Sequence, residues 1–207
     1  RGDENFAPLP VLAAVFIASS SALMFEISLT RIFSFVVSYH FVFLIISLAV
    51  LGLGIGGLIS YKMRGQLSGN GKGKRRLMLF AVLFALSQAI STLGLLFANP
   101  NFILAYVTLA MFPFVAAGMF LSSLFLHFSS ISHRIYFADL SGAAIGSLLV
   151  VPLLQRLGAA STGLLLGAYA STIPLLLAWR VYGRKQLLVW LLPLLLLLGL
   201  FSFNLAG

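Results

Sequence analysis

The sequence predicts an all-α integral membrane protein with about seven transmembrane helices, and three observations lead to that prediction. Hydrophobic residues make up 61% of the 207 residues and charged residues only 8%, which is too little polar surface for a soluble globule. Uncharged apolar runs recur at lengths near the ~20 residues that cross the hydrocarbon core of a bilayer. The basic residues gather between particular runs. We therefore expect a single polytopic membrane domain over residues 1–207.

The expected spans follow one another with short connections. They cover residues 9–36, 41–61, 77–97, 101–126, 136–155, 161–178 and 187–205. Charged residues interrupt only two of them, since Glu26 and Arg31 lie in the first and Asp139 lies near the start of the fifth. No turn signal separates the first span from the second. Either the first helix ends near Ser28 and the residues after it lie in the outer interface, or the first helix is long and tilted.

The distribution of basic residues predicts how the chain is oriented in the membrane. Residues 63–76 (MRGQLSGNGKGKRR) combine Gly, Ser and basic residues and predict a flexible, solvated loop. This loop and those after the fourth and sixth spans hold most of the 13 lysines and arginines, which places them in the cytoplasm. The N-terminus is then cytoplasmic and the C-terminus outside, and we expect a bacterial inner membrane.

The net charge of +9 is explained by this orientation. The expected partners are therefore the lipid bilayer and other membrane protein subunits, and nucleic acid is not among them.

Small residues predict where helices approach one another closely. The segment GLGIGG contains Gly52, Gly54, Gly56 and Gly57, and SGAAIG contains Gly142 and Gly146. The pairs Gly52/Gly56 and Gly142/Gly146 have the spacing of the GxxxG packing motif. We expect all six glycines to serve helix packing.

Four charged residues form a possible intramembrane polar site: Glu26, Arg31, Arg134 and Asp139. Glu26 and Arg31 are separated by about 140° and ~7.5 Å of rise on a straight helix, so they do not form an i,i+4 pair. Glu26 is either a protonatable or cation-binding carboxylate lining a cavity, or a structural ion pair or polar anchor. Asp139 is either part of this site, or it caps a helix starting at Leu140 or pairs with a basic group at the inner surface.

No catalytic, metal or cofactor site is predicted. The chain has no cysteine, and His40, His127 and His133 lack the spacing of metal ligands. The motifs HExxH and GxSxG are absent from the sequence. We expect a protein that is not an enzyme.

Three segments resemble a known family. They are SSSALMFEISLTRIFSFVVSYH, LAVLGLGIGGLIS and YFADLSGAAIGSLLVVPLLQRLGA. Together they are similar to the membrane region of the membrane-fused spermidine synthase-like proteins, in which a multi-span domain precedes an aminopropyltransferase-like domain. No stretch of this sequence has the composition of that soluble domain, so aminopropyl transfer is not expected of it.

The resemblance implies a scaffold, an anchor or a subunit of a larger membrane assembly. The alternative is a small transporter or channel for an amine, a proton or another small ion that uses Glu26 and Arg31. A transporter predicts a cavity that reaches Glu26, whereas a scaffold predicts a closed bundle with another protein covering part of its lipid-facing surface.

Overall fold

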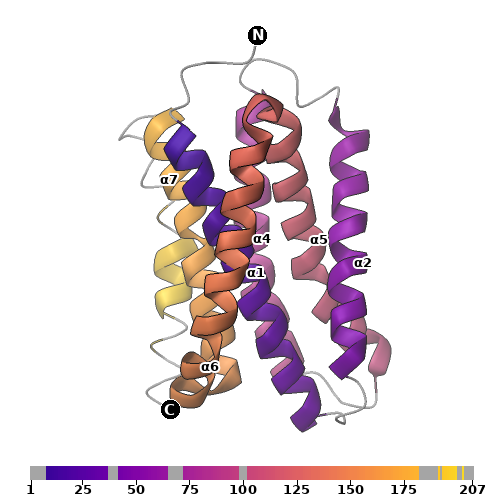
Figure 1. Cartoon of the computed structure of the whole chain (residues 1–207). Helices are drawn as coiled ribbons and strands as arrows, with labels where there is room; N and C mark the ends of the chain where they lie inside the picture. The colour runs from indigo at the N-terminus through magenta and orange to yellow at the C-terminus, as the bar shows by residue number, and fades with distance from the viewer. Residues whose placement is uncertain are drawn as a thin grey trace.

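The protein is built from helices packed side by side in a bundle, as the computed structural model in Figure 1 shows. The structure describes residues 8–36, 42–64, 72–97, 102–181, 191, 193–199 and 202. Its helices are α1 (Pro8–Val36), α2 (Val42–Lys62), α4 (Lys72–Phe97), α5 (Ile103–His127), the short 3-10 helix η2 (Ser129–Ile131), α6 (Ser132–Ala170) and α7 (Thr172–Val181). The all-α prediction is confirmed for the part of the chain that the structure describes.

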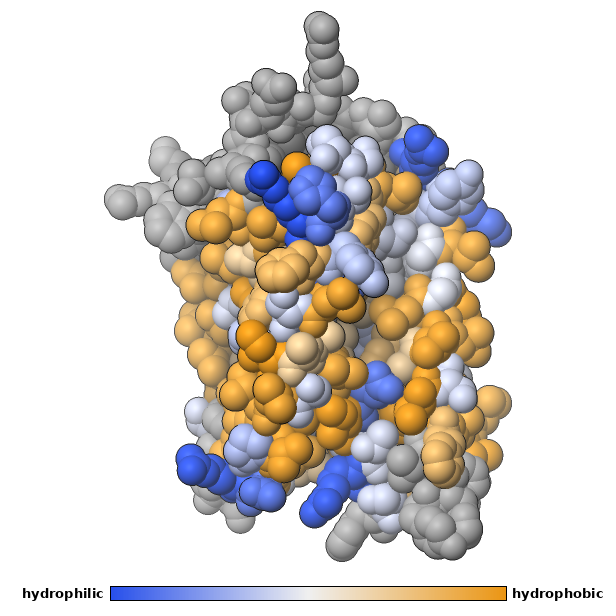
Figure 2. Space-filling view, in the orientation of Figure 1, coloured by the Kyte–Doolittle hydropathy of each residue, from blue (hydrophilic) through white to orange (hydrophobic). Residues whose placement is uncertain are grey.

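The surface of the bundle is that of a membrane protein. Within the described residues, 5 helical stretches are long and apolar enough to cross a bilayer. On the face drawn in Figure 2, hydrophilic residues gather at the two ends of the bundle and apolar residues cover most of the side between them. Large apolar side chains such as Phe43, Leu58 and Leu148 are exposed, and a bilayer would solvate them.

The structure decides between the two alternatives for the end of the first predicted span, and it extends α4 beyond the predicted span 77–97. α1 continues without a break to Val36, so the helix does not end near Ser28 and the alternative of one long helix is correct. α4 begins at Lys72, so the C-terminal part of the predicted loop 63–76 forms the first turns of a helix. Helix propensity explains this extension, because Lys and Arg are good helix formers.

α6 contains a sharp reversal at Gly158, where φ is 75° and ψ is 171°. The residues before this glycine form a first arm, 132–157, and those after it form a second arm, 159–170, which is followed by α7. The predicted span 136–155 lies in the first arm, and the predicted span 161–178 covers most of the second arm and part of α7. The two arms are joined by one non-helical residue. Only glycine adopts this conformation without strain.

Close backbone contacts fix how the helices run relative to one another. Cβ atoms built on Gly142 and Gly146 would lie 2.4 Å from the carbonyl oxygen of Phe16 and 2.7 Å from that of Ser20. The residue numbers increase together, so the first arm of α6 runs parallel to α1. A Cβ on Gly163 would instead meet Thr92, and one on Gly167 would meet Ala85, so the second arm runs antiparallel to α4.

α2 and α5 form a second parallel pair. A Cβ on Gly52 would lie 2.8 Å from Phe114 Cβ, and one on Gly56 would lie 2.2 Å from the Val115 carbonyl oxygen. From the opposite side, a Cβ on Gly118 would lie 2.4 Å from the Leu53 carbonyl oxygen. The backbones of α2 and α5 are therefore in contact at these three glycines. This is the close approach that small residues permit between helices in membranes.

Candidate functional site

Glu26 and Arg31 lie on α1 without contacting each other. Glu26 is half-buried and Arg31 is exposed, and no ion pair involves either of them among the described residues. The sequence prediction that this pair lacks pairing geometry on one helix agrees with that arrangement. The groove described below is lined by other residues and does not include Glu26.

Asp139 has a partner that the sequence did not suggest. It lies inside α6, beyond the first turn, and its Oδ1 accepts a hydrogen bond from Ser19 Oγ of α1. The predicted role of Asp139 as a cap for a helix starting at Leu140 is therefore wrong, because the helix begins at Ser132. Arg134 is exposed near the start of the same helix and does not take part in this contact. The four predicted residues do not form one cluster.

Three consecutive serines of α1 instead form the polar centre of the bundle. After Ser19, Ser20 Oγ lies 3.2 Å from Tyr169 Oη of the second arm of α6. Ser21 Oγ accepts from Gln88 Nε2 of α4 at 3.0 Å and lies 3.3 Å from the Leu166 carbonyl oxygen, to which it donates. Successive helical residues point about 100° apart, so one turn of α1 reaches both α6 arms and α4.

This serine cluster is closed. Ser21 and Gln88 are 0% exposed, and each side chain has a hydrogen-bond partner. In a water-free interior such bonds stabilise helix association by roughly 0.6–2 kcal/mol each. Among the described residues, no group of three or more His, Asp or Glu side chains is placed to hold a metal ion. The arrangement joins α1 to α4 and to both arms of α6.

Sequence reasoning missed the serine cluster, although a signal for it was present. Three adjacent hydroxyls at 19–21 and an amide at Gln88 lie within two predicted spans. An uncharged polar residue at that depth requires a partner from another helix, just as a charged one does.

The six glycines predicted to pack helices fall into two groups. Gly52, Gly56, Gly142 and Gly146 lie at the backbone contacts described above. Gly54 has no described atom within 4 Å of its built Cβ, and Gly57 meets only Ser122 Oγ at 4.0 Å. Gly54 therefore does not serve packing among the residues that the structure describes. It is exposed on α2 together with Val50, Leu58 and Tyr61.

The chain also contains an internal repeat that relates α1 and α2 to α5 and α6. Residues 22–33 (ALMFEISLTRIF) and 117–128 (AGMFLSSLFLHF) are identical at six of twelve positions. Residues 52–59 (GLGIGGLI) and 142–149 (GAAIGSLL) are identical at four of eight. Since these matches include the glycines at both parallel helix contacts, the repeat is structural as well as sequential.

Equivalent residues of the repeat make equivalent contacts. Ser28 Oγ donates to the Met24 carbonyl at 2.8 Å, and Ser123 Oγ donates to the Met119 carbonyl at 2.6 Å. The repeat defines two units, α1 with α2 and α5 with α6. The α1–α6 and α2–α5 contacts are equivalent, because each joins the first helix of one unit to the second helix of the other. α1 and α5 are antiparallel, because Phe25 packs on Phe114 and Phe33 packs on Tyr106. The two units are therefore inverted relative to each other.

All four predicted polar residues lack a polar counterpart in the other unit. Glu26 and Arg31 correspond to Leu121 and Leu126, and Arg134 and Asp139 correspond to Leu44 and Ala49. At the positions equivalent to Ser19 and Asp139, the other unit has Phe114 and Ala49. These two residues belong to one apolar cluster. The repeated helix pairing thus forms without these charges, so their presence in one unit needs another explanation.

Comparisons with known proteins do not supply that explanation. No protein-family model matches this chain, and no curated protein or solved structure matches it.

Proposed function

We propose that this chain is a non-catalytic integral membrane module that acts as a scaffold, an anchor or a subunit of a larger membrane assembly. The observation that carries this proposal is the outer face of α2, formed by Val50, Gly54, Gly57, Leu58 and Tyr61. These residues follow helical spacing on one side of the helix, and a Cβ on Gly54 would meet no described atom. A glycine flanked by large apolar side chains provides the shallow groove into which a partner transmembrane helix packs.

The closed interior of the described bundle supports the same proposal. Backbone contacts at four glycines and a satisfied serine cluster leave the helices little room to separate. The resemblance to the membrane region of spermidine synthase-like fusions fits a module that holds an enzyme or another subunit at the membrane.

The orientation of this module follows from its charges. Lys62, Arg64 and Arg75 lie at one end of the bundle, where α2 ends and α4 begins, and Arg134 lies at the same end, where α6 begins. Arg31 and Arg156 lie at the opposite end. The positive-inside rule then favours a cytoplasmic location for the basic end. The proposed seven spans are α1, α2, α4, α5, the two arms of α6 and a last span that includes residues 193–199. The N-terminus is then cytoplasmic and the C-terminus outside, and the proposed location is a bacterial inner membrane.

Site-specific photo-crosslinking tests the scaffold proposal. A photoreactive residue at Leu58, on the outer face of α2, is expected to capture a protein in native membranes, and Gly54→Leu is expected to reduce that capture at least several-fold by filling the groove. The matched control is the same probe at Leu148, which is 75% exposed on α6. Equal capture from both positions, capture unaffected by Gly54→Leu, or lipid adducts alone would refute a partner helix on this face.

A transporter is the second candidate, and the inverted repeat favours it. Transporters built from inverted units bind substrate between those units, near the middle of the bilayer. Glu26 and Arg31 lie on α1, which crosses α5 of the opposite unit, and the equivalent residues on α5 are leucines. An ionisable residue that the repeated fold does not require is a candidate for ion or amine binding.

Flux through proteoliposomes tests this second candidate. If Glu26 carries a proton or an amine, Glu26→Gln is expected to reduce flux at least tenfold, while Leu121→Gln at the equivalent position is expected to have less effect. Glu26→Leu copies the opposite unit, so it should retain the fold, which a size-exclusion profile in detergent would verify. Absence of flux in the wild type, or equal flux in wild type and Glu26→Gln, eliminates the transporter.

A further inference from the structure

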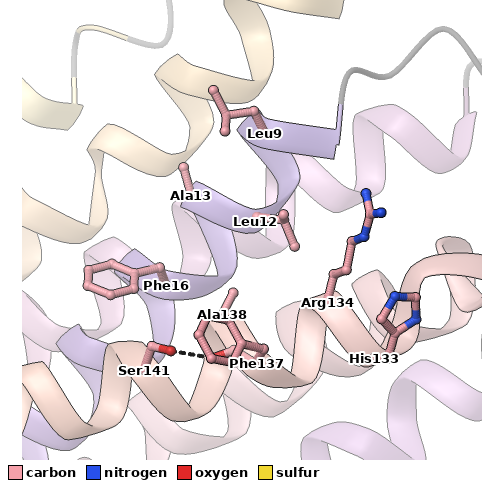
Figure 3. A pocket seen from close by; sticks show the side chains of 9 residues that line it. All are labelled: Leu9, Leu12, Ala13, Phe16, His133, Arg134, Phe137, Ala138 and Ser141. Atoms are coloured by element: carbon pink, nitrogen blue, oxygen red, sulfur yellow. Dashed lines mark hydrogen bonds between the residues drawn. The ribbon is translucent and has the colours of Figure 1, made fainter.

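A groove lies between the first turns of α1 and the start of α6, apart from the outer face of α2. Its volume is about 660 Å³, and Leu9, Leu12, Ala13, Phe16, His133, Arg134, Phe137, Ala138 and Ser141 line it. Figure 3 shows that α1 supplies one wall and α6 the other. Leu9 and Phe137 are 75% and 73% exposed, so the groove opens toward the surrounding lipid.

The two basic residues of the groove lie together at one of its ends. His133 and Arg134 lie at one end of the groove in Figure 3, while Phe16 and Ser141 lie at the other. The Ser141 hydroxyl is already used, because Ser141 Oγ donates to the Phe137 carbonyl at 2.6 Å. None of the described residues that line the groove is an acid, and the nearby Asp139 is engaged by Ser19. The groove is thus apolar along its length and basic at the end nearest the polar end of the bundle.

We propose that this groove binds an anionic phospholipid, with Arg134 and His133 contacting the phosphate-bearing headgroup and the apolar walls receiving an acyl chain. A guanidinium forms two parallel hydrogen bonds to a phosphate, and an imidazole N–H adds a third donor. Basic pockets between membrane helices recognise anionic lipids in this way. The equivalent of Arg134 in the other unit of the repeat is Leu44, so the fold does not require a cation here, and lipid binding explains its presence.

Lipid binding to the purified full-length chain tests this proposal. The delipidated protein in detergent is titrated with phosphatidylglycerol or with phosphatidylcholine of the same acyl chains, and bound lipid is counted by native mass spectrometry. Phosphatidylglycerol is expected to bind more tightly. Arg134→Gln is expected to weaken that binding about fivefold, the effect of losing one basic contact near a membrane surface. The matched control is Arg156→Gln, which removes an exposed arginine at the far end of the same arm and should leave the affinity unchanged.

A second measurement locates the lipid independently of the charge variants. Phe137→Trp, in a background carrying Trp179→Phe and Trp190→Phe, places one indole in the groove wall. Brominated phosphatidylglycerol is expected to quench its fluorescence at lower lipid concentration than brominated phosphatidylcholine. Equal quenching by the two lipids, or equal losses of binding in Arg134→Gln and Arg156→Gln, would overturn the site. The scaffold and transporter candidates do not depend on either result.

Discussion

Gly56→Ala is expected to destabilise the bundle by about 1–3 kcal/mol, while Gly54→Ala is expected to be neutral or stabilising. The two glycines lie two positions apart on α2, yet the added methyl group meets different surroundings. At Gly56 it would lie 2.2 Å from the Val115 carbonyl oxygen and 2.7 Å from the Met119 backbone nitrogen, whereas at Gly54 no described atom lies within 4 Å. Since backbone atoms cannot turn aside as side chains do, α2 and α5 would have to separate.

Thermal unfolding in a fixed detergent measures this difference. Gly146→Ala supplies a further comparison, because Gly146 is the counterpart of Gly56 in the inverted unit and its added Cβ would lie 2.7 Å from the Ser20 carbonyl oxygen. Its loss of stability is expected to be similar in kind. If Gly54→Ala is as destabilising as Gly56→Ala, the close approach of α2 and α5 is not what requires glycine.

Gly158→Ala is expected to cost about 1–3 kcal/mol for a different reason, which is backbone strain. A Cβ at Gly158 would have open space around it, with no described atom within 4 Å, but the residue has a positive φ of 75°. This conformation reverses α6, so relieving the strain would require the second arm to change direction relative to the first.

The matched control for this prediction is Gly57→Ala, because Gly57 lies within α2 and its Cβ would make only an ordinary contact at 4.0 Å. The midpoint of unfolding is expected to fall for Gly158→Ala and to stay constant or rise for Gly57→Ala. A stable Gly158→Ala protein would show that the two arms tolerate another connection.

The sequence predicted those features that depend on composition and on local spacing. Length and hydropathy are properties of one helix, so the all-α class and most helix positions followed from them. The spacing of Gly52 with Gly56 and of Gly142 with Gly146 predicted close helix contacts, but it did not distinguish them from Gly54, whose side of α2 faces outward. That distinction depends on which face of α2 meets α5.

Features that depend on helix pairing were not predictable in this way. The partner of Asp139 is Ser19, 120 residues earlier, and nothing near Asp139 in the sequence indicates that α1 lies against it. The reversal of α6 was expected as an ordinary connection between two spans, because one glycine in RLGAAS does not reveal its backbone angles. The inverted repeat was detectable in the sequence, but only by comparing segments about 90 residues apart.

The inverted repeat has a consequence for membrane insertion. Two units that form the same helix contacts in opposite directions present similar packing to both leaflets, so the packing contributes little to the choice between the two ways of inserting the chain. The orientation then depends on basic residues that are concentrated at one end of the bundle, among them Lys62, Arg64, Arg75 and Arg76. Few changes in charge would therefore allow this chain to insert in both orientations. We expect neutralisation of those residues to yield a population inserted in both directions.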